Sequence, residues 1–164
     1  MTVRKTNPQI FVIEREFAYS PELVFFALTN AEAKKVWFAG PPGWVSGPSS
    51  FDFSVGGREV SSGGPVGGPM HIYDSRFLEI IPNERLINAF TMHEDDTILT
   101  ASLAVTELAA GGKGTKLKFT EQITFLDGHD HLPGRIEGTE AMFDLLSGYM
   151  DARYGVQKGA KTDA

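Results

Sequence analysis

Two glycine-rich stretches raise the question of phosphate binding. Residues 53–69 read FSVGGREVSSGGPVGGP, and residues 111–116 read GGKGTK, which superficially resembles a phosphate-binding loop. A dinucleotide loop needs the pattern G-x-G-x-x-G between a strand and a helix, because the helix N-terminus binds the phosphate. A strand-like segment follows each stretch here, so we predict turns, in which glycine readily adopts left-handed backbone conformations, and no nucleotide site.

A histidine-rich loop offers residue types that could bind a metal ion. His129, Asp130 and His131 lie together in the segment DGHDHLPG, and imidazole and carboxylate groups are zinc ligands. Adjacent loop residues rarely converge on one ion without a ligand from elsewhere, and the sequence does not bring His71 or His93 near. We therefore expect a solvated loop that caps the last helix, and we predict no metal site.

Nucleophilic catalysis finds no support in the sequence. The chain has no cysteine, which excludes thiolate nucleophiles, thiolate metal sites and disulfides. It also lacks the G-x-S-x-G motif of hydrolases that use a nucleophile elbow. We predict no catalytic residue and no cofactor.

Two charged residues fall on strand faces that are otherwise mostly apolar. In TKLKFTEQITF, residues 115–125, every second residue from Lys116 onward is polar, so the opposite face must point to the interior. That inner face consists of Thr115, Leu117, Phe119, Glu121, Ile123 and Phe125. In QIFVIEREF, Arg15 shares a face with Phe11, Ile13 and Phe17. An unpaired buried charge costs several kcal/mol, so Glu121 and Arg15 each need a partner.

The elements that would hold these residues follow from periodicity. Residues 9–17 predict a first strand, and two short helices follow it, SPELVFFALTN and AEAKKVWF, with Ser20 and Asn30 as N-caps. From residue 51 onward, alternating segments such as FDFSV, joined by short turns, predict an antiparallel meander. Residues 135–154 predict one long helix. We therefore expect an α+β fold in which a curved antiparallel sheet of about six or seven strands wraps around the C-terminal helix.

The composition narrows the classes of partner. The chain has 164 residues, which fit a single domain at 1–154, and we expect a disordered tail at 155–164. The net charge of −6, without a basic run, argues against nucleic acid and an anionic membrane surface as partners. The twelve Phe residues, against two Trp, hint at a large apolar interior. No long apolar stretch opens the chain, so we expect neither a secretory signal nor a membrane anchor, and a cytoplasmic location.

Four motifs, in order, resemble the START-like (SRPBCC, birch-pollen-allergen-like) helix-grip superfamily, and within it the heat-shock-protein ATPase activator homologues. The first is REFAYSPELVFFALTNAEAKKVWF, and the second is FDFSVGGR, with Gly56 and Gly57 as the paired glycines of the family turn. The third is FLEIIPNERLINAFT, and the fourth joins GGKGTKLKF with EGTEAMFDLL. Together they cover roughly residues 10 to 150. The stretch 58–69 is richer in glycine than the family pattern, so we predict that residues 61–69 form a flexible flap at the sheet rim.

The resemblance implies that the first and last strands are neighbours. We therefore predict a partly buried ion pair between Arg15 and Glu121. Its structural role would be to fix the strand register, and its functional role would be to anchor a ligand in an apolar cavity. We favour the structural role and keep the ligand anchor as the alternative.

The resemblance also implies a cavity between the sheet and the long helix. Gly138 on this helix would leave space that faces the sheet. The side chains predicted to line the ligand site are Trp37, Phe38, Phe53, Tyr73, Phe90, Phe119, Glu121, Met142, Leu145, Leu146 and Tyr149, together with Gly138. Ligand cavities are typically apolar with few polar groups, which fits this set.

Three functions remain open from the sequence. The first is a cytoplasmic module that binds a small apolar or amphipathic molecule. The second is an enzyme, since relatives of this fold include polyketide cyclases and aromatases, with Glu121 or a cavity His or Tyr as acid or base. The third is a stress-related co-chaperone with a chaperone partner. Binding requires least beyond the cavity and is our prediction, for a monomer or a homodimer.

Overall fold

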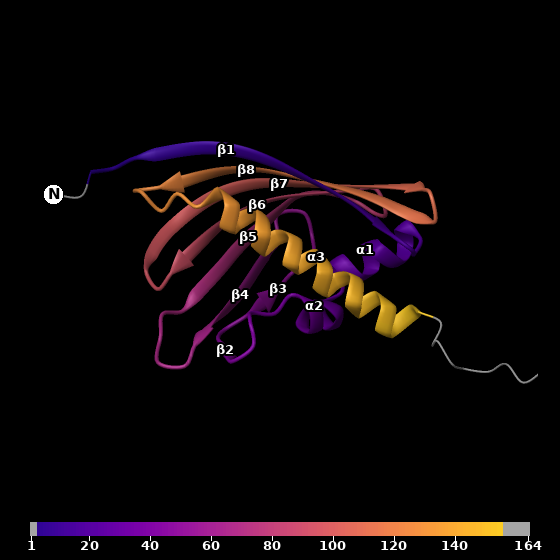
Figure 1. Ribbon diagram of the computed structural model, residues 1–164, viewed down its shortest axis with the longest axis horizontal. Helices are drawn as coiled ribbons and strands as arrows, with labels where there is room; N and C mark the ends of the chain where they lie inside the picture. Colours follow the sequence, from indigo (N-terminus) through magenta and orange to yellow (C-terminus); the bar gives the residue numbers. More distant parts are fainter. Residues whose placement is uncertain (1–2, 156–164) are drawn as a thin grey trace, which may run out of the picture.

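The computed structural model describes residues 3–155, which form one sheet and three helices (Figure 1). The elements are β1 (Thr6–Phe17), α1 (Pro21–Thr29), α2 (Ala31–Trp37), β2 (Trp44–Ser46), β3 (Ser50–Phe51), β4 (Arg58–Pro65), β5 (His71–Ile81), β6 (Arg85–Glu94), β7 (Thr97–Gly111), β8 (Gly114–Leu126) and α3 (Leu132–Tyr154). The expected tail, residues 155–164, lies outside the described residues except for Gly155.

All strand pairs of the sheet are antiparallel, in the order β1-β8-β7-β6-β5-β4-β2, with β3 also on β4. The predicted helix-grip fold is confirmed, including the pairing of the first strand with the last. The sheet has eight strands, more than the six or seven expected. The unexpected strands are β2, in the connection after α2, and β4, which lies in the glycine-rich stretch; the two pair with each other.

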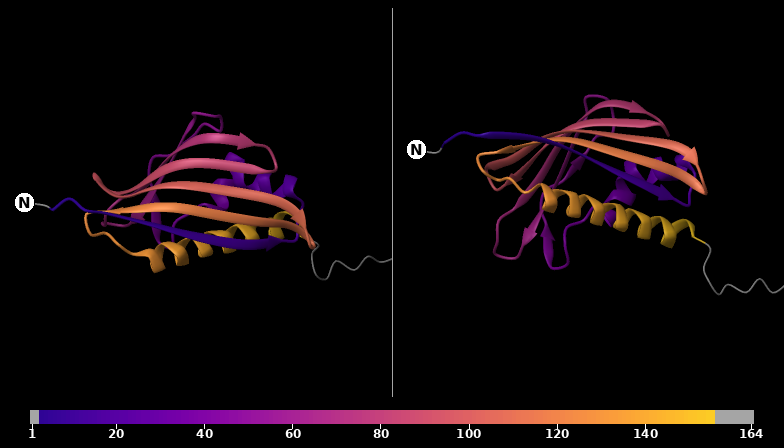
Figure 2. Two further views of the ribbon diagram at one scale, coloured as in Figure 1. Left: turned by 90° about the horizontal axis from the view of Figure 1, so that it is seen from above. Right: turned by 45° about the horizontal axis from the view of Figure 1, so that its top comes forward.

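The long helix α3 runs along one face of the curved sheet, and α1 and α2 contact it on the same side (Figure 2). The predicted N-caps are present: the Ser20 hydroxyl accepts from the backbone N–H of Leu23, and the Asn30 side chain accepts from that of Ala33. These bonds satisfy N–H groups that a helix start leaves unpaired. Among the described residues, no helix is long and apolar enough to cross a membrane.

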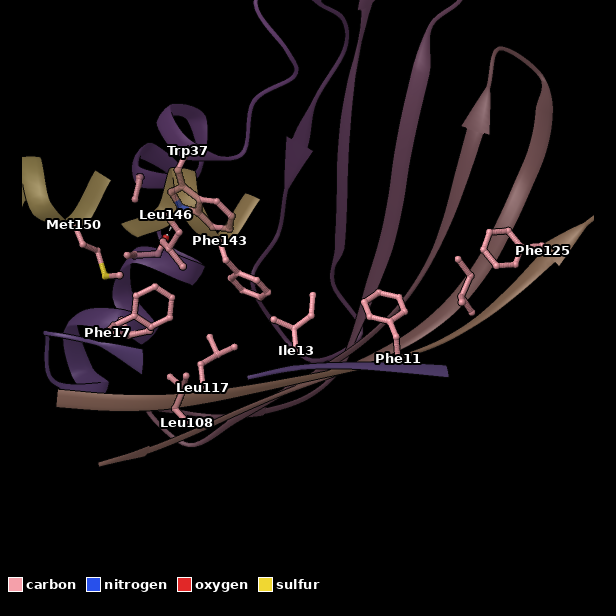
Figure 3. Packing of buried hydrophobic residues seen from close by; sticks show 14 residues of the cluster. Phe11, Ile13, Phe17, Trp37, Leu108, Leu117, Phe125, Phe143, Leu146 and Met150 are labelled. Atoms are coloured by element: carbon pink, nitrogen blue, oxygen red, sulfur yellow. Dashed lines mark hydrogen bonds between the residues drawn. The ribbon is translucent and has the colours of Figure 1, made fainter. Parts of the chain in front are cut away.

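The hydrophobic core lies mainly where the C-terminal half of α3 meets the two short helices and strands β1 and β8 (Figure 3). Phe143, Leu146 and Met150 of α3 are almost fully buried there. Trp37 at the end of α2 is 4 % exposed, and its indole N–H donates to the Ala27 carbonyl oxygen at 2.8 Å. This bond ties α2 to α1 beneath α3.

The glycine-rich stretch is only partly a connection. Ser61 to Pro65, predicted as part of a flexible flap, belong to strand β4, which pairs with β5 on one side and with β2 on the other. Glycine serves close approach here, because a Cβ on Gly64 would lie 2.2 Å from the Pro69 carbonyl oxygen. The prediction of a loose flap over 61–69 is therefore wrong for its first half. The turn itself is short and includes Gly67 in the left-handed region.

The segment FDFSV is not a continuous strand. Pairing ends at Phe51, and Val55 is exposed rather than inward-facing. The chain turns because backbone bonds join Gly56 and Gly57 to Phe77, and Gly56 has a φ of +83°. Phe53 nevertheless stacks on Phe51 at 5.9 Å between ring centroids.

The Trp37 hydrogen bond provides a test of how the short helices are held. We expect Trp37→Phe to lower the free energy of unfolding by about 1–3 kcal/mol, because the Ala27 carbonyl oxygen loses its buried partner. Trp44→Phe is the control: its half-buried ring keeps the stacking on His71, so the loss should stay below about 1 kcal/mol. Urea unfolding followed by circular dichroism measures both, and equal losses would contradict this role for the bond.

Candidate functional site

A cavity of about 320 Å³ lies between the sheet and the N-terminal half of α3. Its wall is mostly aromatic and aliphatic, with a few polar side chains among them. The lining residues are Leu28, Lys34, Trp37, Phe38, Glu59, Tyr73, Phe77, Leu86, Asn88, Phe90, Met92, Ala104, Thr106, Phe119, Glu121, Gly134, Arg135, Gly138, Thr139, Met142 and Phe143. The volume falls at the lower end of the range of about 300–1,000 Å³ for sites that hold drug-sized molecules.

The structure brings most of the predicted lining residues to this cavity and leaves four of them away from its wall. Those at the wall are Trp37, Phe38, Tyr73, Phe90, Phe119, Glu121, Gly138 and Met142. Phe53 stacks within an aromatic cluster with Phe51 and Phe77 instead. Leu146 is buried in the core, Tyr149 packs against that core, and Leu145 is 49 % exposed. The last three fail because the cavity faces only the first half of α3.

Gly138 leaves space under the first half of α3. A Cβ built on Gly138 would have no heavy atom within 4 Å, so the position faces open space as predicted. Gly134, one turn earlier, also lines the cavity, but a Cβ there would clash with the His131 ring, so this glycine permits close approach of that side chain. In the second half of α3, large side chains such as Leu146 and Met150 fill the space between the helix and the rest of the core. The helix is therefore in close contact with the core at one end and separated from the sheet at the other.

Glu121 lies inward, as the alternation in the last strand predicts, and only 1 % of its surface is exposed. Arg135 Nη1 and Ser102 Oγ both donate to its Oε2 atom, at 2.7 and 2.8 Å. Arg135 also donates to the Thr100 hydroxyl at 2.8 Å. Burial raises the pKa of the Glu121 carboxyl, while the charge of Arg135 and the hydrogen bonds from Ser102 and Arg135 oppose that rise.

The predicted pair between Arg15 and Glu121 is wrong. Strands β1 and β8 are neighbours, but Glu121 lies opposite Phe11, and Arg15 lies opposite Leu117, four residues along the strand. Arg15 pairs with Glu140 and Asp144 of α3, each at 2.8 Å. The sequence shows that both charges point inward, but the register of the two strands decides that they cannot meet.

A second buried ion pair, between Lys34 and Glu59, closes another part of the wall. The Lys34 amine is 2.6 Å from Glu59 Oε2 and 2.7 Å from Oε1, and Glu59 is 4 % exposed. The amine also lies 4.6 Å from the centroid of the Phe38 ring, a cation–π distance. Burial lowers the pKa of Lys34, and the Glu59 charge opposes this. The pair joins α2 to β4 across the cavity rim.

Tyr73 and Asn88 form a polar network on the sheet side. The Asn88 amide nitrogen donates to the Tyr73 hydroxyl at 2.9 Å and to the Ser75 hydroxyl at 3.0 Å. Burial raises the pKa of the Tyr73 hydroxyl above its usual range, and the charge of Glu59 adds to this. The network holds the Tyr73 ring beside Phe38 and Phe90.

Sequence reasoning missed Lys34, Glu59, Asn88 and Arg135 as cavity residues. Lys34 had a readable signal, because it lies three residues before Trp37 and so shares its helix face. The signal for Arg135 was weaker: this residue lies in the first turn of a helix that packs over the sheet face on which Glu121 points inward. Asn88 and Glu59 had none, since their strands contain polar residues on both faces.

Other chemistries have less support in residues 3–155. No group of three or more His, Asp or Glu side chains there could hold a metal ion. A larger groove, of about 730 Å³, is lined mainly by charged side chains of the strands: Glu14, Arg15, Glu16, Ile81, Glu84, Arg85, Glu107, Leu108, Ala109, Lys116, Leu117 and Lys118. The cavity between the sheet and α3 is thus predominantly apolar, whereas this groove is charged.

The fold and the apolar cavity define a START-like helix-grip domain. Residues 18–151 match the family described as Activator of Hsp90 ATPase homolog 1-like protein, and the chain belongs to this family. The resemblance found in the motifs is thus confirmed. A search of the curated proteins gave no match. The family and the fold support a ligand-binding or co-chaperone-like domain.

Solved structures share this architecture over nearly their whole length. An uncharacterised protein from Rhizobium leguminosarum is 36 % identical, with a TM-score of 0.87 over 92 % of this chain and 99 % of its own. The Mll3558 protein from Rhizobium loti is also 36 % identical, with a TM-score of 0.82 over 88 % of this chain and 99 % of its own. An AHSA1-like protein from Aeromonas hydrophila, 20 % identical, has a TM-score of 0.69 over 92 % of this chain and 97 % of its own, and shows the shared fold alone.

The Lys34–Glu59 pair makes a strong prediction about stability. We expect Lys34→Met to lower the free energy of unfolding by about 3–5 kcal/mol, because Glu59 is left buried without a counter-charge. The double variant Lys34→Met with Glu59→Leu should recover much of this loss. Urea unfolding measures all variants.

A neighbouring ion pair supplies the control. Lys35 pairs with Glu32 at 3.1 Å, but both side chains are exposed. Lys35→Met should therefore change stability by no more than about 0.5 kcal/mol. Similar losses for Lys34→Met and Lys35→Met would contradict the buried role of Lys34.

The raised pKa of Glu121 predicts a pH dependence of stability. The folded protein holds this proton more tightly than the unfolded chain, whose glutamic acid pKa is 4.5. Wild-type stability should therefore fall relative to Glu121→Gln as the pH rises from 4.5 through the raised value. Urea unfolding over a pH series measures the difference, with Glu137→Gln, at an exposed α3 position, as the control for loss of one negative charge. Parallel curves for wild type and Glu121→Gln would contradict the shift.

Proposed function

We propose that the protein binds a small apolar or amphipathic molecule between the sheet and the first half of α3. The carrying observation is the 320 Å³ cavity, whose wall is aromatic and aliphatic with a few polar groups at defined positions. Burial of an apolar ligand there removes its surface from water at roughly 25 cal/mol per Å². The cavity requires no metal and no covalent chemistry to do this.

The arrangement of α3 supports the same proposal. A core-only role would be served by large side chains along the whole inner face of the helix, since close packing stabilises a domain. Instead, Gly138 stands at the cavity wall, and a Cβ there would touch nothing. Glycine inside a helix lowers stability by about 0.5–1 kcal/mol relative to alanine, so its presence at the wall favours a role in ligand space over a role in stability.

A fluorescent probe tests the proposal. N-phenyl-1-naphthylamine is uncharged and apolar, and we expect saturable binding of one molecule per chain, measured by its fluorescence increase. Gly138→Phe should weaken this binding by about tenfold or more, because the new ring occupies the cavity. Gly138→Ala should retain binding.

The control is another glycine of α3, Gly148, which has equal space around a built Cβ. Gly148 also has no heavy atom within 4 Å of a built Cβ, but it does not line the cavity. Gly148→Phe should therefore bind the probe like wild type. Absence of saturable binding to wild type, or equal weakening by Gly138→Phe and Gly148→Phe, would contradict the proposal.

A further inference from the structure

The cavity floor has a polar row between two mixed rows. Asn88, Ala104 and Glu121 lie directly opposite one another on the neighbouring strands β6, β7 and β8. The adjacent rows each hold two apolar residues and one hydroxyl group, namely Leu86, Thr106 and Phe119 on one side and Phe90, Ser102 and Ile123 on the other. Since neighbouring strands lie about 4.8 Å apart, Asn88 and Glu121 stand roughly 10 Å apart. The small Ala104 side chain leaves space between Asn88 and Glu121.

One oxygen of Glu121 is free to accept a hydrogen bond from a ligand. Both side-chain donors of the described chain that reach this carboxylate, Arg135 and Ser102, end on Oε2. No hydrogen bond from residues 3–155 ends on Oε1. No fully enclosed side-chain nitrogen or oxygen in that range lacks a hydrogen-bond partner, so Oε1 must be open to the cavity that Glu121 lines. An acceptor that opens into an apolar cavity and has no partner in the protein favours a ligand that donates to it, because a ligand that displaced water without donating would leave it unsatisfied.

Asn88 adds a second acceptor to the row. Its amide nitrogen donates to the hydroxyls of Tyr73 and Ser75, which fixes the orientation of the amide. Among the described residues, no hydrogen bond ends on its carbonyl oxygen, and Asn88 lines the cavity. The row therefore presents acceptor oxygens at both ends, with donors already used inside the protein.

The charges of the cavity are balanced without a ligand. Glu121 pairs with Arg135 at 2.7 Å, and Glu59 pairs with Lys34 at 2.6 Å. A ligand that brought a net charge into this wall would need a counter-charge that the cavity does not supply, and the desolvation of that charge would oppose binding. The wall thus favours an uncharged molecule.

We propose that the ligand is an uncharged, predominantly apolar molecule with a hydroxyl or N–H group that donates a hydrogen bond to Glu121 Oε1. This inference rests on the proposed function and adds the chemical class of the ligand. The donor group lies over the polar row beside Ala104, and the apolar body contacts Phe119 and Phe90 on either side of it. Molecules that only accept hydrogen bonds are disfavoured at this position.

A matched pair of probes tests the donor requirement in the wild-type protein. 2-Naphthol carries a hydroxyl donor, and 2-methoxynaphthalene has the same ring system with the donor replaced by an acceptor. At mildly alkaline pH we expect wild type to bind 2-naphthol at least about tenfold more tightly, the effect of one hydrogen bond to a charged group. Ligand fluorescence titration measures both dissociation constants. 2-Naphthoate, which is anionic, should bind more weakly than 2-naphthol.

Glu121→Gln gives the sharpest outcome. Because Arg135 and Ser102 both donate to the Oε2 position, the glutamine carbonyl oxygen must stand there, and its NH₂ group then takes the place of Oε1. The preference for 2-naphthol over 2-methoxynaphthalene should disappear or reverse. Thr106→Val is the control, because it removes another hydroxyl of the cavity wall with little change of shape, and it should leave the preference unchanged.

The outcomes separate this inference from the function on which it rests. Equal binding of the two probes by wild type, or an unchanged preference in folded Glu121→Gln, overturns the donor requirement and leaves ligand binding in place. Binding of neither probe by wild type overturns the proposed function and this inference together. If Glu121→Gln does not fold, the wild-type comparison of the two probes decides the inference alone.

Discussion

The packing of the second half of α3 against the core is the constraint on which the cavity depends. Phe143, Leu146 and Met150 hold this part of the helix between the sheet and the two short helices. A helix is stiff over this length, so fixing one half also fixes the position of the other. The first half then lies above the sheet with the cavity beneath it, and Gly138 faces open space there. The ion pairs of Arg135 with Glu121 and of Glu140 with Arg15 also tie this first half to the sheet.

The polar groups of the cavity follow a second constraint, which is that each buried charge has a partner. Arg135 reaches Glu121 from α3, and Lys34 reaches Glu59 from α2, so each pair joins a helix to the sheet. Removing either partner leaves an uncompensated charge, whereas the complete pairs orient the elements around the cavity. The same contacts therefore shape the wall and set its electrostatic character.

The sequence predicted the fold well because its patterns are local. Alternation alone placed Glu121 inward, and the caps Ser20 and Asn30 marked the helix starts. The partners of the buried charges were harder to predict, because they depend on strand register and on helix placement. Arg15 shows this, since it pairs with Glu140 and not with Glu121. The prediction of a flap in the glycine stretch was wrong for another reason. Glycine is typical of turns, but Gly64 in strand β4 permits close approach of the backbone. Composition alone cannot distinguish these two uses of glycine.

The cavity-lining segment of α3 has a consequence for variation within the family. Six of the residues that line the cavity, from Gly134 to Phe143, lie on one continuous helical segment. Substitutions at five of them, all except the core residue Phe143, would change the size and polarity of the cavity without altering the strand register. On the proposed function, changes in this single short segment would alter ligand preference while the scaffold stays the same. The residues that would set specificity are then separate from the strand pairings that define the fold.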